Sequence, residues 1–434
     1  MNDNLRKFLH YLFAQGVPAL LGFVALTYIS NSLGEKKFGE LSIYLMILQV
    51  STVVIGLNTP NVMQRIFFKL DKEDSSRVLL SFILLSLFML CLLIVISMLC
   101  FEFISTIYTF LDINLLHLVL LGGLLTAVSN LVTKYNVFQE ESTIILTSNI
   151  MRAVVNNLGS VMIYIVFKPM IWLRIIAYVV GYFISVIMQF KKINIRFSKV
   201  TEHRNDIFSN LKFIFPSFIL SFTAILISSA DRIIIESHFG LEQLGIYTLA
   251  FLVGQSISLV FDASFNAMLP KFMMSVKDKD FVKANSYVKY FDIISFTMGV
   301  LSLVFGIIYY SYFASDGFSQ GMQVYMLFVI ALTFGARYKL ANTVVIHDDY
   351  YWYSTVSSIV CSLVALCMSY SLIPKIGLMM APISMLTQVS LYSFLVFIHP
   401  SYRSRIPYSK FQVFTVLLSL SVVIIYLGIS LHET

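Results

Sequence analysis

Two neighbouring residues of opposite charge, Asp231 and Arg232, lie near the end of a long apolar segment, within SSADRIIIESHFGLEQLGIY (residues 228–247). An arginine inside a membrane costs about 2.5 to 3.5 kcal/mol on insertion scales, so it usually faces a cavity or is paired. Guanidinium also matches the geometry of phosphate. Arg232 is therefore a candidate phosphate ligand, and Asp231 a candidate orienting or ion-coupling carboxylate. Alternatively, both side chains reach the headgroups at the outer end of their helix.

Arg152 lies deeper inside its own apolar segment, too far from the ends for an easy reach to the headgroups. Asn149 and Asn156 precede and follow it by three and four residues, which places them on a related helix face. We expect this polar stripe to face a water-filled lumen or another helix. The alternative is an arginine that is satisfied only by hydrogen bonds between helices.

Three further charged residues are candidates for the same site. Arg65 and Lys271 lie at the inner ends of two corresponding helices, and we group them with the substrate-binding cations. Asp262 is a candidate ion-coupling carboxylate, for which structural pairing is the alternative role. No P-loop, nucleophile elbow or zinc-ligand spacing occurs, so we expect no enzymatic activity, no metal and no cofactor.

The elements that position these residues are apolar helices. Of the 434 residues, 58% are hydrophobic and only 12% are charged, far fewer than the roughly 25% charged residues of a soluble domain. The apolar runs are long enough for membrane-spanning helices and do not alternate as barrel strands do. We therefore predict an all-α integral membrane protein with about 12–13 transmembrane helices. The predicted spans are Phe8–Ser32, Leu41–Val62, Val78–Ile104, Leu115–Thr133, Thr143–Phe167, Met170–Phe190, Phe213–Ile235, Leu244–Met268, Phe291–Ala314, Gln323–Val345, Ser354–Ile373, Gly377–Ile398 and Phe411–Leu431.

The net charge of +7 follows the predicted loops. With a cytoplasmic N-terminus, most of the 30 Lys and Arg residues lie on the inner side, as the positive-inside rule requires. Arg152 and Arg232 fall inside spans, and the outer side holds five basic residues, namely Lys36, Lys37, Lys168, Arg174 and Lys375. The charge therefore indicates orientation rather than nucleic-acid binding.

The chain divides into two similar halves. We predict an N-terminal six-helix lobe (1–190), a basic cytoplasmic linker (191–212), a C-terminal six-helix lobe (213–400) and an extra C-terminal helix (401–434). Corresponding turns carry Gly-x4-Gly in both halves, 206 positions apart. Such parallel repeats are related by a pseudo-two-fold axis along the membrane normal, with the substrate route between them. Alternatively, glycine and proline simply recur in tight turns. The predicted structural turns are at Gly34, Gly39, Gly240, Gly245, Pro374 and Gly377.

The chain resembles the polysaccharide transporters, or O-antigen (repeat-unit) flippases, of the multidrug/oligosaccharidyl-lipid/polysaccharide flippase superfamily. The resemblance rests on LGEKKFGELSIY (33–44), SSADRIIIESHFGLEQLGIY (228–247), SLIPKIGLMMAP (371–382), and FQEES followed by Arg152. It implies two lobes around a central cavity that alternates between inward-open and outward-open forms.

The resemblance also implies the cargo and the setting. The cargo would be a polyprenyl-diphosphate-linked oligosaccharide, flipped from the cytoplasmic to the outer leaflet of a bacterial inner membrane during O-antigen or lipopolysaccharide synthesis. Membrane lipid and polysaccharide polymerase or assembly proteins would be its partners. A drug or cation exporter of the same superfamily is the alternative, and it should prefer cavity carboxylates. A membrane-embedded glycan polymerase usually carries a long outer loop, and no such loop is predicted here.

Overall fold

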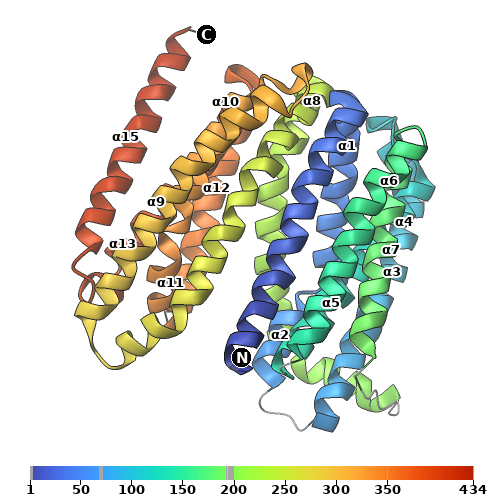
Figure 1. Cartoon of the computed structure of the whole chain (residues 1–434), viewed down its shortest axis with the longest axis horizontal. Coiled ribbons are helices and arrows are strands. Elements are labelled where there is room, and N and C mark those ends of the chain that lie inside the picture. Colours follow the sequence, from blue (N-terminus) through green and yellow to red (C-terminus); the bar gives the residue numbers. More distant parts are fainter. Residues whose placement is uncertain are drawn as a thin grey trace. The chain divides into compact units, whose positions relative to one another are not determined.

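The computed structural model describes residues 3–67, 72–139, 141–191, 193, 200–348 and 350–433. Within these ranges every regular element is a helix (Figure 1). In chain order the elements are α1 (Asp3–Gly56), α2 (Thr59–Ile66), α3 (Lys72–Ile107), α4 (Ile113–Phe138), α5 (Ser142–Ala153), the π-helix η2 (Val154–Leu158), α6 (Gly159–Val166), α7 (Ile171–Phe190), α8 (Val200–Lys277), α9 (Phe281–Tyr312), the 3₁₀-helix η3 (Asp316–Phe318), α10 (Gly321–Ala336), α11 (Tyr338–His347), α12 (Tyr351–Ile376), α13 (Met380–Ile398), α14 (Pro400–Arg403) and α15 (Ser409–Glu433).

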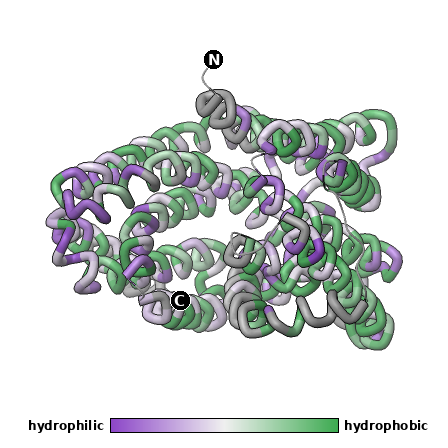
Figure 2. The backbone as a smooth tube through the Cα atoms, turned by 90° about the horizontal axis from the view of Figure 1, so that it is seen from below, coloured by the Kyte–Doolittle hydropathy of each residue, from purple (hydrophilic) through white to green (hydrophobic). Residues whose placement is uncertain are grey.

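Ten helical segments of the described chain are long and apolar enough to cross a membrane. Two of them, Gly16–Met63 and Ser229–Leu269, each contain parts of two predicted spans, because the helix changes direction inside them. The thirteenth predicted span corresponds to α15. Figure 2 shows hydrophobic residues along much of the backbone trace. The chain is thus a multi-pass α-helical membrane protein, and the predicted fold class is confirmed.

Glycines create the breaks inside the two longest helices. Gly34 in α1 has φ 70° and Gly240 in α8 has φ 80°, a left-handed conformation that side chains with a Cβ rarely adopt. Gly377, with φ 97°, ends α12 in the same way. Pro374 lies in the last turn of α12. The chain thus changes direction at the three glycines, whereas Pro374 lies inside the helix that Gly377 ends.

The chain forms two compact units. Unit 1 comprises residues 1–33 and 40–226, and unit 2 comprises residues 34–39 and 227–434. The boundary falls inside α8 rather than at the predicted linker. Of that linker, residues 192 and 194–199 lie outside the described part of the chain, and α8 already begins at Val200.

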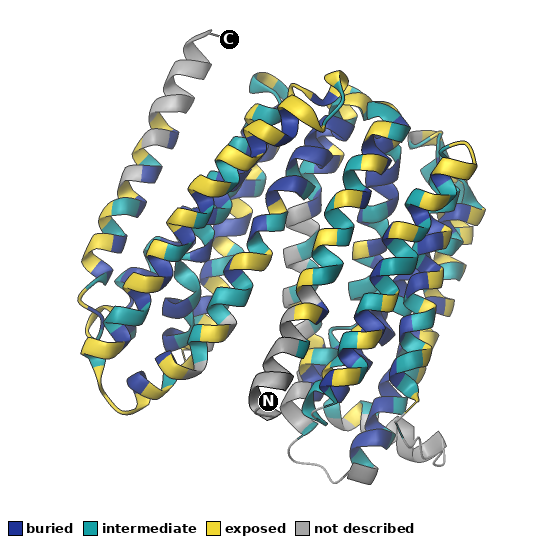
Figure 3. Ribbon diagram, viewed as in Figure 1, coloured by how far each residue is buried: buried dark blue, intermediate teal, exposed yellow. Residues whose placement is uncertain are grey.

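In unit 1, α4 packs against α7, α3 and α2. Its core includes the fully buried side chains of Ile55, Phe82 and Val132. In unit 2, α13 packs against α10, α12 and α15, and Val396 and Phe397 of α13 are completely buried. Figure 3 shows buried and exposed positions alternating along the helices, as expected for helices with one packed face and one face towards lipid.

A symmetric pair of backbone contacts lies within unit 2, beside the glycine turns. A Cβ on Gly39 would come within 1.9 Å of the Leu241 carbonyl oxygen, and a Cβ on Gly245 within 2.1 Å of the Glu35 carbonyl oxygen. Glu35 and Leu241, like the two glycines, are 206 positions apart. The same contact is therefore made twice, as internal duplication predicts. Only glycine permits backbones to approach this closely.

Candidate functional site

Arg152 lies in the last turn of α5, one residue before the helix ends at Ala153 and the π-helix η2 begins. Its guanidinium lies 4.8 Å from the centre of the Tyr182 ring on α7, a distance suited to a cation–π contact. The Tyr182 ring in turn packs against that of Tyr178 at 4.6 Å. Within the described part of unit 1, Arg152 forms no ion pair with a carboxylate. Its charge is therefore held by an aromatic surface rather than neutralised.

The π-helix separates the residues of the predicted polar stripe. Asn156 belongs to η2, whereas Asn149 and Arg152 belong to α5. Because a π-helix has a different number of residues per turn, α-helical spacing does not hold between Arg152 and Asn156. Gly181 of α7 allows the close packing of this segment, since a Cβ there would lie 3.1 Å from the Arg152 carbonyl oxygen. The Oδ1 atom of Asn149 is buried and has no hydrogen-bond partner among the residues that the structure describes.

Arg174 makes a further set of polar contacts in unit 1. It lies within the candidate span Ile171–Phe190, as it does within the predicted span Met170–Phe190. Its Nη1 atom donates to Asn156 Oδ1 at 2.7 Å and to Ser160 Oγ at 2.9 Å. Arg174 thus ties α7 to η2 and α6. Sequence reasoning did not identify these contacts, although Arg174 is the fourth residue of the apolar helix α7.

In unit 2, the adjacent residues Asp231 and Arg232 have different partners. The Arg232 side chain is buried, with 4% of its residue surface exposed, and its guanidinium lies 5.3 Å from the centre of the Phe251 ring. The carboxylate of Asp231 accepts a hydrogen bond of 3.4 Å from the Tyr247 hydroxyl. Among the described residues, no carboxylate forms an ion pair with Arg232. All four residues lie on α8, on either side of the turn at Gly240.

Asp262 and Asp292 each have a basic partner. Lys339 Nζ forms an ion pair with Asp262 Oδ1, and Arg337 Nη2 forms one with Asp292 Oδ2 at 2.9 Å. Arg337 and Lys339 lie within the candidate span Gly321–His347, as they do within the predicted span Gln323–Val345.

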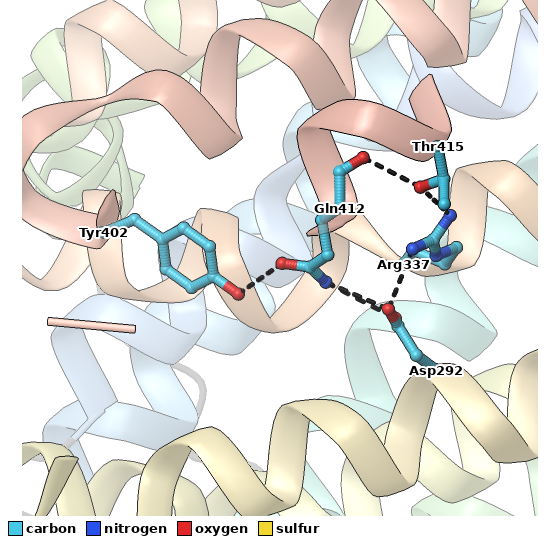
Figure 4. Close-up of polar contacts among 5 residues, drawn as sticks. All are labelled: Asp292, Arg337, Tyr402, Gln412 and Thr415. Atoms are coloured by element: carbon cyan, nitrogen blue, oxygen red, sulfur yellow. Dashed lines mark hydrogen bonds and ion pairs between the residues drawn. The ribbon is translucent and has the colours of Figure 1, made fainter. Parts of the chain in front are cut away.

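The Asp292–Arg337 pair belongs to a larger buried network (Figure 4). Gln412 of α15 donates from its amide to Asp292 Oδ2 at 3.2 Å and accepts at Oε1 from the Tyr402 hydroxyl at 2.8 Å. Arg337 also donates to Thr415 Oγ1 at 2.8 Å. The network therefore fastens α15 to α9 and to the α10–α11 junction. Sequence reasoning missed it, although Asp292 and Gln412 both interrupt apolar runs.

Within its described residues, the structure shows no partner that would assign a role to the other predicted site residues. Lys271 is exposed near the end of α8 and has no ion-pair partner among the described residues. Arg65 belongs to α2, but its side chain lies outside the described part of the structure. The whole residue Glu140, in the FQEES segment, also lies outside it. The Gly34, Gly39, Gly240 and Gly245 positions form turns or close contacts and offer no side chain to a ligand.

The fold defines the class of protein. It matches the inward-facing form of a multidrug resistance MATE family transporter of the MOP superfamily, with a TM-score of 0.64 and 12% identity over 93% of this chain and 98% of that one. It matches the inward closed form of the lipid II flippase MurJ equally well, with a TM-score of 0.64 and 14% identity over 97% and 98%. A MOP superfamily transporter from Pyrococcus furiosus, described as having a binding pocket of reverse polarity, matches at 0.59 with 13% identity over 94% and 96%.

The family follows from the sequence. Residues 4–276 match the model of the family described as polysaccharide biosynthesis protein. This chain belongs to that family, and the resemblance seen in its motifs is confirmed. No curated protein matches the chain significantly.

Proposed function

We propose that this protein is a flippase that moves polyprenyl-diphosphate-linked oligosaccharide repeat units from the cytoplasmic to the outer leaflet of a bacterial cytoplasmic membrane. Family membership supports a role in polysaccharide synthesis, and the shared fold supports transport. The N-terminus would be cytoplasmic, as the distribution of basic residues indicates.

The observation that carries this proposal is the difference between two groups of basic residues. Arg337 and Lys339 are neutralised by carboxylates. Arg152 and Arg232 instead contact aromatic rings and, among the described residues, form no ion pair. A buried cation without a counter-ion is costly, so it is usually retained for a ligand. A diphosphate supplies the missing negative charge and the acceptor geometry that guanidinium favours.

The rings behind the guanidinium groups support binding of this kind. A cation held over an aromatic face keeps its N–H groups at the edge, where they remain available to phosphate oxygens. Arg152 and Arg232 are the proposed phosphate ligands, with Arg65 and Lys271 as the first cations met at the cytoplasmic side. Translocation then needs no covalent step, because cargo shifts the carrier between its states only through different affinities for them.

Asp231 is the proposed ion-coupling or orienting carboxylate, since it forms no ion pair with Lys or Arg among the described residues and is held by the hydroxyl groups of Tyr247 and Ser369. Asp262 is the weaker candidate because Lys339 already neutralises it. Dissipating the ion gradient should slow net flipping in vesicles. Asp231→Asn should abolish this dependence on the gradient while the protein remains inserted.

The test of the function is the position of the cargo after loss of the protein. We expect completed repeat units to accumulate on the lipid carrier, accessible only from the cytoplasmic face, without surface polymer. If single units still reach the outer leaflet, the protein acts in polymerisation. If surface glycan is unchanged and only toxin sensitivity rises, the protein is an exporter and the flippase proposal is wrong.

A further inference from the structure

A pocket of about 540 Å³ opens in unit 2, in a part of the fold to which the transport arginines do not contribute. Its size lies within the roughly 300–1,000 Å³ that is usual for small-molecule sites. Three stretches of chain line it. They are the turn around Gly240, the connection from η3 to α10, and the turn between α12 and α13.

Two of these stretches come from the motifs that carry the family resemblance. Phe239 and Gln243 belong to the FGLEQLG segment, while Gly377 and Met379 belong to SLIPKIGLMMAP. They are more than 100 residues apart in sequence, and left-handed glycines in both turns bring them to one pocket. At Gly377, a Cβ would meet nothing within 4 Å. These turns therefore build a recess as well as reversing the chain.

The lining has the chemistry of a site for neutral polar ligands. It presents the side-chain amides of Gln243, Gln320 and Gln323, and no hydrogen bond within the described structure uses them. Each amide offers two donors and an acceptor, which suits vicinal hydroxyl groups. Phe239 is 37% exposed and provides an apolar face for a sugar ring. No charged residue lines the pocket.

We propose that this pocket binds neutral sugar residues of the transported glycan, and this inference rests on the proposed flippase function. The pocket lies beyond the C-terminal end of α9, a helix of 32 residues and therefore about 48 Å long. The basic end of unit 2, with Lys271, lies at the other end of that helix. The sugars would thus be held on the outer side after the diphosphate has crossed.

The same lining argues against other occupants. A phosphate or an anionic headgroup would lack a cation among the lining residues. A lipid tail would leave three amides facing hydrocarbon without partners, which is costly. A glycan with hydroxyl groups satisfies these amides and covers the Phe239 ring at the same time.

Binding can be measured directly with Phe239→Trp as a fluorescent reporter, in a background in which Trp172 and Trp352, the two native tryptophans, are phenylalanine. The purified full-length protein is titrated with neutral dextran oligosaccharides and, separately, with anionic hyaluronan oligosaccharides. We expect saturable quenching by dextran only. Replacing Gln243, Gln320 and Gln323 by leucine should weaken binding by about tenfold or more. Gln255→Leu, an exposed amide on α8 outside the pocket, should not weaken it.

Transport supplies the second measurement. In vesicles, the triple leucine variant should flip an oligosaccharide-bearing polyprenyl diphosphate about tenfold more slowly than wild type, and a single-sugar version at the wild-type rate. Gln323→Leu, at an exposed position, keeps the comparison valid if the triple variant fails to fold. If no dextran quenching occurs, or only hyaluronan quenches, the pocket inference is wrong. If wild type binds dextran but flips neither lipid, the flippase proposal fails instead.

Discussion

At the scale of single residues, the partner of each basic side chain decides its role. Lys339 and Arg337 have carboxylate partners, so they bring no net charge to their surroundings. Arg174 is satisfied by the neutral acceptors of Asn156 and Ser160. Arg152 and Arg232 rest on aromatic rings and retain a positive charge that a ligand can neutralise.

The first prediction concerns these two arginines. Arg152→Ala and Arg232→Ala should each reduce flipping by at least about tenfold while leaving the protein inserted, because a charged hydrogen bond contributes about 1.5–3 kcal/mol. Arg→Lys at either position should also impair flipping, because the lysine ammonium is a point charge and lacks the planar set of N–H donors with which a guanidinium binds two phosphate oxygens. Flipping is measured in vesicles with labelled cargo. Arg403→Ala, at an exposed position on α14, is the matched control, and wild-type rates in both alanine variants would assign the arginines a structural role.

The second prediction concerns pH and His399. The Nδ1 atom of His399 accepts a hydrogen bond from the Ser401 N–H and so caps α14, which requires a neutral ring. Burial lowers the pKa of His399, and the charge of Asp348 offsets part of this effect. Because the folded pKa is lower than the unfolded value of about 6.5, the contribution of His399 to stability is complete above that pH. This contribution to stability decreases as the pH falls from about 6.5 through the lower pKa of the folded protein.

Thermal unfolding in detergent between pH 8 and pH 5 measures this effect. His399→Asn keeps a capping acceptor that does not titrate. The difference in Tm between wild type and this variant should therefore change as the pH drops below about 6.5. A constant difference across the range would show that His399 does not titrate with unfolding.

At the scale of elements, helix breaks and close contacts position the site. The turns at Gly34 and Gly240 each divide one long helix, and the π-helix η2 changes the direction of the side chains that follow Arg152. The α15 helix is held by Gln412 and Thr415, which reach the buried Asp292–Arg337 pair.

The third prediction tests the repeated glycine contact. Gly39→Ala and Gly245→Ala place a Cβ about 2 Å from a backbone carbonyl oxygen, so the backbones must move apart. We expect each to destabilise the protein by about 1–3 kcal/mol, the usual cost of overpacking. Gly16→Ala is the control, because nothing lies within 4 Å of its Cβ. Equal Tm values for all three variants would contradict the close contact.

The fourth prediction tests the anchor of α15. Arg337→Met leaves Asp292 buried beside Gln412 without its counter-ion, which should cost about 3–5 kcal/mol. Adding Asp292→Asn removes the isolated charge, so the double variant should be more stable than Arg337→Met alone. Thermal unfolding compares the two. A double variant that is less stable than the single one would mean that Asp292 has a second role.

At the scale of the whole molecule, the chain is a multi-pass membrane protein with the fold of MOP superfamily transporters. Its two units each have their own hydrophobic core. The two breaks in the long helices correspond to one another in sequence, as expected for a duplicated chain.

The fifth prediction concerns orientation. With the four native cysteines replaced, Glu242→Cys should react with an impermeant reagent only from outside, and Asp278→Cys only from the cytoplasm. Both positions are exposed, so access depends on the side of the membrane. Intact and permeabilised cells distinguish the two sides. Labelling of both residues in intact cells would overturn the proposed topology.

The sequence by itself determined the membrane class, the approximate spans and the turns at Gly34, Gly240 and Gly377. These depend on local properties, namely run length, hydropathy and the need for glycine at positive φ. It also indicated the family, because the motif residues lie in those turns. It did not reveal the polar partners of Arg174, Arg337 and Lys339, since such contacts depend on which helix faces pack together.

Only the tertiary structure decided which charges are paired. The partners Asp292 and Arg337 are 45 residues apart, Lys339 and Asp262 are 77 apart, and Arg337 and Thr415 are 78 apart. Hydropathy and spacing carry no information about such contacts, because the pairing depends on which helix faces pack together. For the same reason, the convergence of the turns at Gly240 and Gly377 on one pocket became visible only in the folded chain.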